Sequence, residues 1–96
     1  GVFDMARNAV KTVTGLREAI MALMYTRTGP MEIGKNVEAA EFAVDELYRD
    51  MGLKILDSDM DVRVVLILRD IIDLIKEIAD RAVDALDLTM ILALSF

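Results

Sequence analysis

The stretch RDIIDLIKEIADRAVDALD, residues 69–87, combines a core-forming apolar pattern with a row of acidic side chains. Its Ile, Leu, Ala and Val residues recur at steps of three and four, the spacing that places side chains on one face of an α-helix. Its carboxylates follow the same steps and form a second row: Asp70, Asp73, Glu77, Asp80, Asp84 and Asp87. The stretch therefore predicts a long amphipathic helix that carries an acidic stripe.

The same spacing predicts two further helices earlier in the chain. The three predicted helices cover about residues 2–27, 32–55 and 60–94. Gly29 and Pro30 end the first pattern, because proline cannot continue a helix and disfavours the helical conformation in the residue before it. Asp57, Ser58 or Asp59 is expected to cap the start of the third helix.

Each predicted helix has an apolar seam that we expect to face the core. The seams are Val2, Ala6, Ala9, Val13, Leu16, Ile20 and Leu23 in the first helix; Ile33, Val37, Ala40, Val44, Leu47, Met51 and Ile55 in the second; and Val64, Leu68, Ile71, Ile75, Ile78, Ala82 and Ala85 in the third, widened by Ile72, Ala79 and Leu86. No strand-type alternation competes with them, and both connections are short.

Together these patterns predict one all-α domain over residues 1–96, an up-down-up antiparallel three-helix bundle with a long third helix. At 1.5 Å per residue the third helix would be roughly 50 Å long, against roughly 35 Å for each of the others. One end of the third helix should therefore extend past its neighbours and contact another chain.

The composition excludes several classes of protein. The 96 residues carry a net charge of -6, which argues against nucleic acid as a partner because phosphate binding depends on Lys and Arg. The chain has no Cys and no His, so it lacks disulfides, thiolate or imidazole metal ligands, and the usual general base. Paired carboxylates alone, on a small bundle without a deep pocket, favour a protein that is not an enzyme.

A hydrophobic content of 55% exceeds what one small domain needs for its own core, which indicates a partner. No uncharged run reaches the roughly 20 residues of a membrane-spanning helix. We therefore expect a cytoplasmic protein. A peripheral location at the inner membrane stays open. Because the sequence begins with Gly rather than Met, it is open to three interpretations: a processed product, a tagged protein or a fragment of a longer one.

The acidic stripe requires a source of positive charge. Like charges at helical spacing repel, and five successive steps cost on the order of 1 to 2 kcal/mol. A solvated charged face is the simplest interpretation of such a row. Basic side chains of a neighbouring helix, such as Arg7, Lys11 and Arg17, or bound cations could offset the repulsion.

The second helix carries acids at the same steps. Glu38, Glu41 and Asp45 flank its apolar seam, and acids four residues apart hold their carboxylates about 6 Å from each other. If the second and third helices are antiparallel neighbours, the segments EFAVD and DRAVD bring four carboxylates together. Such a site would be built from oxygen ligands alone.

The segments EFAVDELYRDM and LIKEIADRAVDALD resemble the signature segments of the PhoU-like superfamily, the phosphate-transport regulators and their divergent relatives. The resemblance covers about residues 36–88 and implies a three-helix bundle whose acidic motifs hold divalent or ferric metal ions. Carried over by position, the metal ligands are Glu41, Asp45, Asp80 and Asp84, with Glu38, Asp73 and Glu77 as secondary candidates. Lys76 departs from the pattern, since many relatives have an acid there, and it would remove a ligand or neutralise the site.

The resemblance implies a non-enzymatic regulatory or accessory domain in phosphate or ion transport. Such a domain would bind metal cations through its acidic helix faces, and a second copy or a membrane transporter component through its apolar surface. Two alternatives stay open. One is a purely structural helical oligomerisation domain, whose acidic stripe pairs with Arg or Lys. The other is an accessory cytoplasmic domain of a cation transporter or channel.

Overall fold

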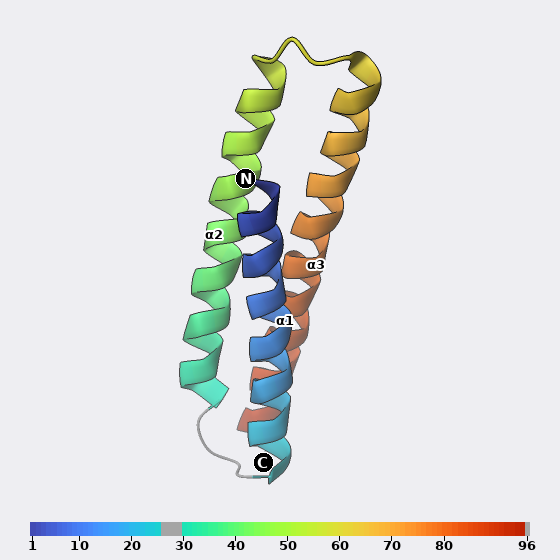
Figure 1. Ribbon diagram of the computed structural model, residues 1–96. Coiled ribbons are helices and arrows are strands. Elements are labelled where there is room, and N and C mark those ends of the chain that lie inside the picture. Colours follow the sequence, from blue (N-terminus) through green and yellow to red (C-terminus); the bar gives the residue numbers. More distant parts are fainter. Residues whose placement is uncertain (26–29, 96) are drawn as a thin grey trace.

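Three helices make up the computed structural model, which describes residues 1–25 and 30–95. They are α1 (Val2–Tyr25), α2 (Pro30–Leu56) and α3 (Val62–Leu94). Each helix packs against the other two, and α2 runs opposite to α1 and α3 (Figure 1). The predicted all-α three-helix bundle with a long third helix is confirmed, and it measures 54 × 16 × 16 Å.

The helix boundaries lie close to the predicted ones. α1 is helical to Tyr25, and the predicted end at residues 26 and 27 lies outside the described residues. α2 begins at Pro30, two residues earlier than predicted. The fixed φ of proline suits the first position of a helix, where its missing N–H costs nothing.

The predicted cap of the third helix is wrong. α3 begins at Val62, and its N-cap is Asp61, whose carboxylate accepts a hydrogen bond of 2.9 Å from the backbone N–H of Arg63. None of the predicted residues 57–59 holds this position. The Ser58 hydroxyl instead donates to a carbonyl in the last turn of α2, at 2.8 Å.

The predicted core face is confirmed on α2 and at the widening positions Ile72, Ala79 and Leu86 of α3, whereas part of the predicted seam on α1 and α3 is exposed. On α2 the predicted seam is buried or half-buried throughout. On α1 and α3 the buried residues are Met5, Ala9, Thr12, Gly15, Ala19 and Leu23, and Ile72, Ala79, Ala82, Leu86 and Thr89. Five predicted seam residues are exposed instead: Val13, Ile20, Val64, Ile71 and Ile78. The buried row is thus offset by about one residue from these five positions, and on α3 it follows the residues that were predicted to widen the seam.

Two buried threonines explain part of this offset. Thr12 donates to the carbonyl of Ala9 at 2.6 Å, and Thr89 donates to the carbonyl of Ala85 at 2.8 Å. Because each hydroxyl is satisfied within its own helix, these positions can be buried like apolar ones. A seam chosen by hydrophobicity passes over them and shifts to the neighbouring apolar row.

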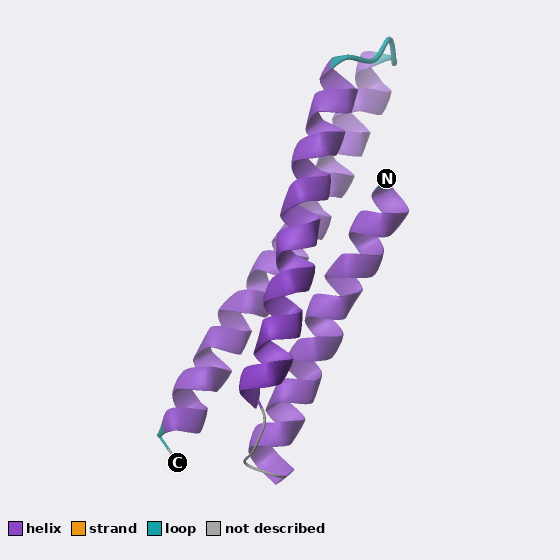
Figure 2. Ribbon diagram, turned by 90° about the vertical axis from the view of Figure 1, so that its left-hand side faces the viewer, coloured by secondary structure: helices purple, strands orange, loops and turns teal. Residues whose placement is uncertain are grey.

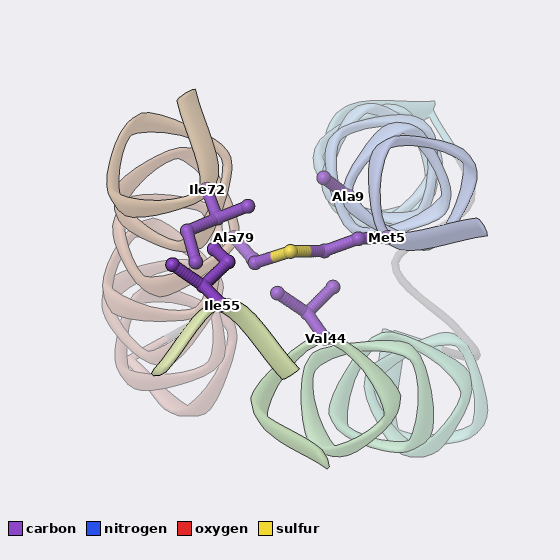
Figure 3. Packing of buried hydrophobic residues seen from close by; sticks show 6 residues of the cluster. All are labelled: Met5, Ala9, Val44, Ile55, Ile72 and Ala79. Carbon is purple, nitrogen blue, oxygen red and sulfur yellow. The ribbon is translucent and has the colours of Figure 1, made fainter. Parts of the chain in front are cut away.

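The centre of the core lies where all three helices meet. The Met5 side chain of α1 extends between Val44 of α2 and the α3 side chains Ile72 and Ala79 (Figure 3). A second cluster, nearer the C-terminal end of α3, contains Ala19, Val37 and Leu86.

A glycine brings α1 close to α2. A Cβ at Gly15 would overlap the Cγ2 atom of Val37, so only a residue without a side chain fits there. A glycine in the middle of a helix costs roughly 1 kcal/mol of stability. At Gly15 this cost is accepted because the missing side chain lets α1 and α2 pack tightly.

α1 is the shortest helix, and it leaves the far end of the α2–α3 hairpin uncovered. The 24 residues of α1 span roughly 36 Å and the 33 residues of α3 roughly 50 Å. The extension predicted for α3 lies at its start, together with the last turns of α2 (Figures 1 and 2). None of the described helices combines the length and the apolar character needed to cross a membrane.

Candidate functional site

A polar groove of about 710 Å³ runs between α2 and α3. Its wall on α2 includes Glu41 and Tyr48, and its wall on α3 is formed by the charged side chains between Asp73 and Asp84. The α3 wall carries most of the predicted acidic stripe. The groove is therefore the place where the acids predicted on two helices can meet.

Three of the four principal predicted ligands do meet there. Glu41 and Asp45, one turn apart on α2, and Asp80 on α3 each offer a carboxylate oxygen, and these oxygens lie within 4.8 Å of one another. We call these three residues the carboxylate cluster. The antiparallel packing of α2 against α3 brings them together, and this packing was the condition on which the predicted site depended.

Lys76 already supplies positive charge to the carboxylate cluster. Its ammonium lies 2.8 Å from Asp80 Oδ2, one turn along α3, and 3.4 Å from Asp45 Oδ1 across the groove. Asp45 Oδ1 is buried, and its contact with Lys76 is an ion pair without hydrogen-bond geometry. The hydrogen bond to Asp80 raises the pKa of Lys76, with the charge of Asp45 adding to it. Lys76 thus ties α2 to α3 as a fixed counter-ion.

Glu41 receives no such compensation. Burial, followed by the interactions with Asp45 and Asp80, raises the pKa of Glu41 from 4.5 to about 7. Three carboxylates meet one ammonium in the cluster, and burial together with the neighbouring carboxylates favours the protonated form of Glu41. The cluster therefore has capacity for a further proton or another cation.

Asp84, the fourth predicted ligand, does not join the cluster. Its side chain is 67% exposed and lies 3.8 Å from Arg81 Nη1. Asp84 lines the groove between α2 and α3, but its carboxylate is not among the three that converge in the cluster. The four-carboxylate site expected from the sequence is a three-carboxylate cluster in the structure.

The secondary candidates also lie outside the cluster. Glu38 is exposed on α2, and Glu77 faces Arg81, its Oε1 atom 3.9 Å from Arg81 Nε. Asp73 accepts a hydrogen bond of 2.6 Å from the Tyr48 hydroxyl, which raises the pKa of Tyr48. This contact was not predicted from the sequence. The position of Tyr48, one turn beyond Asp45 on the same side of α2, could have indicated it.

The positive charge beside the stripe comes from α3 itself. Lys76 and Arg81 contact its carboxylates, whereas Arg7, one of the side chains expected to do so from α1, lies 3.3 Å from Asp4 instead. Much of the predicted repulsion along the stripe is therefore relieved within the same helix.

Comparisons of this chain with protein-family models, with curated proteins and with solved structures find no match.

Proposed function

We propose that this chain is a non-enzymatic regulatory or accessory domain that binds a cation at the carboxylate cluster and another chain through its apolar surface. The observation that carries the proposal is the convergence of Glu41, Asp45 and Asp80 from two helices within 4.8 Å. Three carboxylates meet one ammonium there, that of Lys76. The pKa of Glu41 is raised by its burial and then by the neighbouring carboxylates. A bound cation would supply the missing charge and would hold α2 and α3 together.

The donor set suits a particular class of cation. Three carboxylates and no imidazole or thiolate favour hard ions such as Mg²⁺, Mn²⁺, Ca²⁺ or ferric iron. Such an ion competes with the Lys76 ammonium, which contacts two of the three carboxylates. The affinity of the cluster for metal therefore depends on how readily Lys76 is displaced.

The biological process follows from the sequence resemblance alone. Residues 36–88 resemble the signature segments of the PhoU-like superfamily, and this supports a role in regulating phosphate or ion transport. The absence of His and Cys from the sequence supports the non-enzymatic part of the proposal.

A second candidate function is favoured by Lys76 itself. With its ammonium 2.8 Å from Asp80, the cluster can serve as an internal salt-bridge network. The chain would then be a structural oligomerisation domain whose binding surface is apolar.

Thermal unfolding of metal-stripped protein separates the two candidates. An ion that binds only the folded state, at 100 times its dissociation constant, stabilises by about 2.7 kcal/mol and raises Tm by several degrees. The Asp45→Asn/Asp80→Asn variant should lose this shift. The matched control, Asp70→Asn/Asp87→Asn, removes two exposed carboxylates of the same stripe and should keep it.

The Lys76→Met variant sharpens this experiment. Because it removes the competing ammonium, it should bind the ion more tightly than the parent chain and show a larger Tm shift. If Mg²⁺, Mn²⁺, Ca²⁺, Zn²⁺, Ni²⁺ and iron leave the Tm of both proteins unchanged, the cation proposal is wrong and the structural candidate replaces it.

A further inference from the structure

α3 carries a second apolar row that the bundle does not bury. Its core row contains Ile72, Ala79 and Leu86. One position away, the second row runs through Val64, Ile67, Ile71, Leu74, Ile78 and Arg81, at alternating steps of three and four. Every apolar residue of this run is exposed, Leu74 to 61% and Ile78 to 50%. The row resumes at Leu88 and Leu92, which are also exposed.

α1 has a matching row. It runs through Phe3, Val10, Val13, Arg17, Ile20 and Met24 at compatible steps, and all six are exposed. We call the second rows of α1 and α3 the outer rows. Among the described side chains of α2, exposed apolar residues such as Phe42 and Leu53 are separated by the charged residues Glu46 and Arg49, so no continuous apolar row forms there. Apolar residues repeated at an average of 3.5 positions are the pattern by which helices pack against other helices.

The outer rows lie side by side on one face. Val13 of α1 and Ile78 of α3 together line two adjoining apolar grooves of about 590 and 280 Å³. Val13 and Ile78 lie at about one level, because they line the same two grooves. α1 and α3 run in the same direction (Figure 1), so the next residues of the two rows, Arg17 and Arg81, also lie at about one level. The face is thus apolar along its length, with one pair of arginines across it.

We propose that this face binds the same face of a second copy of the chain, so that α1 and α3 of both copies form a four-helix core with α2 outside. The inference deepens the apolar part of the proposed function and is independent of the cation part. The helices of each copy have the heptad spacing that packs into the groove of the other.

The exposed area agrees with such a dimer. The outer rows contain twelve large apolar side chains that are between 38% and 86% exposed. At about half exposure, side chains of this size present on the order of 500 Å² of apolar surface. A stable interface buries roughly 800 Å² per partner, about 60% of it apolar. The face is therefore large enough for a specific dimer.

The charges fix the orientation of the two copies. A two-fold axis along the bundle would bring Arg17 and Arg81 of both copies to one level, where four like charges repel. A two-fold axis perpendicular to the bundle near Val13 and Ile78 avoids this and places Arg81 of each copy near Glu77 of the other. Glu77 and Arg81 both line the groove beside Leu74 and Ile78. The proposed dimer is therefore antiparallel.

Sedimentation equilibrium of the full chain from about 1 to 200 µM tests the dimer. The mass should double with a Kd on the order of micromolar, and Leu74→Glu/Ile78→Glu should raise Kd at least roughly 100-fold while helical circular dichroism persists. Phe42→Glu, at a 58% exposed position of α2 outside both rows, is the matched control and should leave Kd unchanged. A chain that stays monomeric, or a dimer that the double variant does not weaken, overturns the proposal, whereas neither result affects the metal-dependent Tm.

Disulfide formation tests the orientation, because the chain has no cysteine of its own. Ile78→Cys lies near the proposed axis and should cross-link the two copies under mild oxidation. Met24→Cys lies at the end of the α1 outer row and should not, since the antiparallel arrangement separates its two copies. Cross-linking of the second variant without the first would show a parallel dimer and overturn the antiparallel one.

Discussion

α3 is flanked by two grooves of opposite character. On the α2 side, Lys76 lies between Asp45 and Asp80, and every wall of the groove offers charge. On the α1 side, Val13, Leu74 and Ile78 present apolar surface with few polar atoms near it. The first groove contains a counter-ion from its own chain, whereas no segment within residues 1–25 and 30–95 covers the second.

The difference shows how one helix can carry a charged surface and an apolar surface at the same time. Around the circumference of α3, the acidic row of the charged groove is followed by the core row and then by the outer row. The residues of each row recur at steps of three and four. Charge can be balanced locally by one long side chain. Exposed apolar surface can be removed from water only by another surface. The charged side is therefore compatible with a monomer, while the apolar side favours association.

The largest effect is expected at Gly15, where α1 closely approaches α2. Gly15→Ala should lower the free energy of unfolding by about 1 to 3 kcal/mol, since its Cβ would overlap Val37. Chemical denaturation measures this loss. Gly52→Ala is the control: no atom lies within 4 Å of its added Cβ, so it should gain up to about 1 kcal/mol. Equal stability of the two variants would contradict the tight contact.

Lys76→Met tests whether the charged groove depends on its own counter-ion. Without metal, the variant should lose about 1 to 2 kcal/mol at pH 7, less than a fully buried pair because Lys76 is 33% exposed. Arg81→Met removes a side chain that is 75% exposed and should cost under about 0.5 kcal/mol. A larger loss for Arg81→Met would show that the groove is held together elsewhere.

Glu41→Gln tests the negative charge of the same groove, and its effect should depend on pH. The folded-state pKa of Glu41, about 7, is above its ordinary value of 4.5, so the folded chain binds the proton more tightly than the unfolded chain. The contribution of Glu41 to stability therefore falls as pH rises from 4.5 to 7 and stays low above it.

Relative to the parent chain, Glu41→Gln should accordingly raise Tm at pH 8 and change it little at pH 4. Thermal unfolding across this range measures the difference. A variant less stable than the parent at pH 8 would show that the ionised carboxylate of Glu41 is favourable where it lies.

The fold could be predicted from the sequence because three long patterns share one period. The exact core row on α1 and α3 could be predicted only in part, since each helix has two apolar rows one residue apart. Hydrophobicity favours Val13 on α1, where the structure buries Thr12 instead; on α3 it favours Ala79 and Ile78 alike, and only Ala79 is buried. Small and hydroxyl-bearing residues allow the helices to approach, and that requirement depends on the neighbouring helix rather than on the local sequence.

The candidate site was partly predictable for a similar reason. The step of four residues places Glu41 beside Asp45, and antiparallel packing adds Asp80. Whether Asp84 joins them depends on how far it is turned from α2, which the sequence pattern leaves open. The double contact of Lys76 with Asp45 and Asp80 depends on the packing of α2 against α3, which the spacing of residues along one helix does not determine.

The uncovered end of the α2–α3 hairpin has a consequence for local motion. Around the turn between residues 57 and 61 only two helices pack together, and Leu53, Leu56 and Val62 are each at least 66% exposed. Segments with so few buried contacts open at a lower free energy than the whole domain. Backbone amides near this turn should therefore exchange with deuterium well before those around Ala79. The bundle would thus unravel from this end, with the three-helix region opening last.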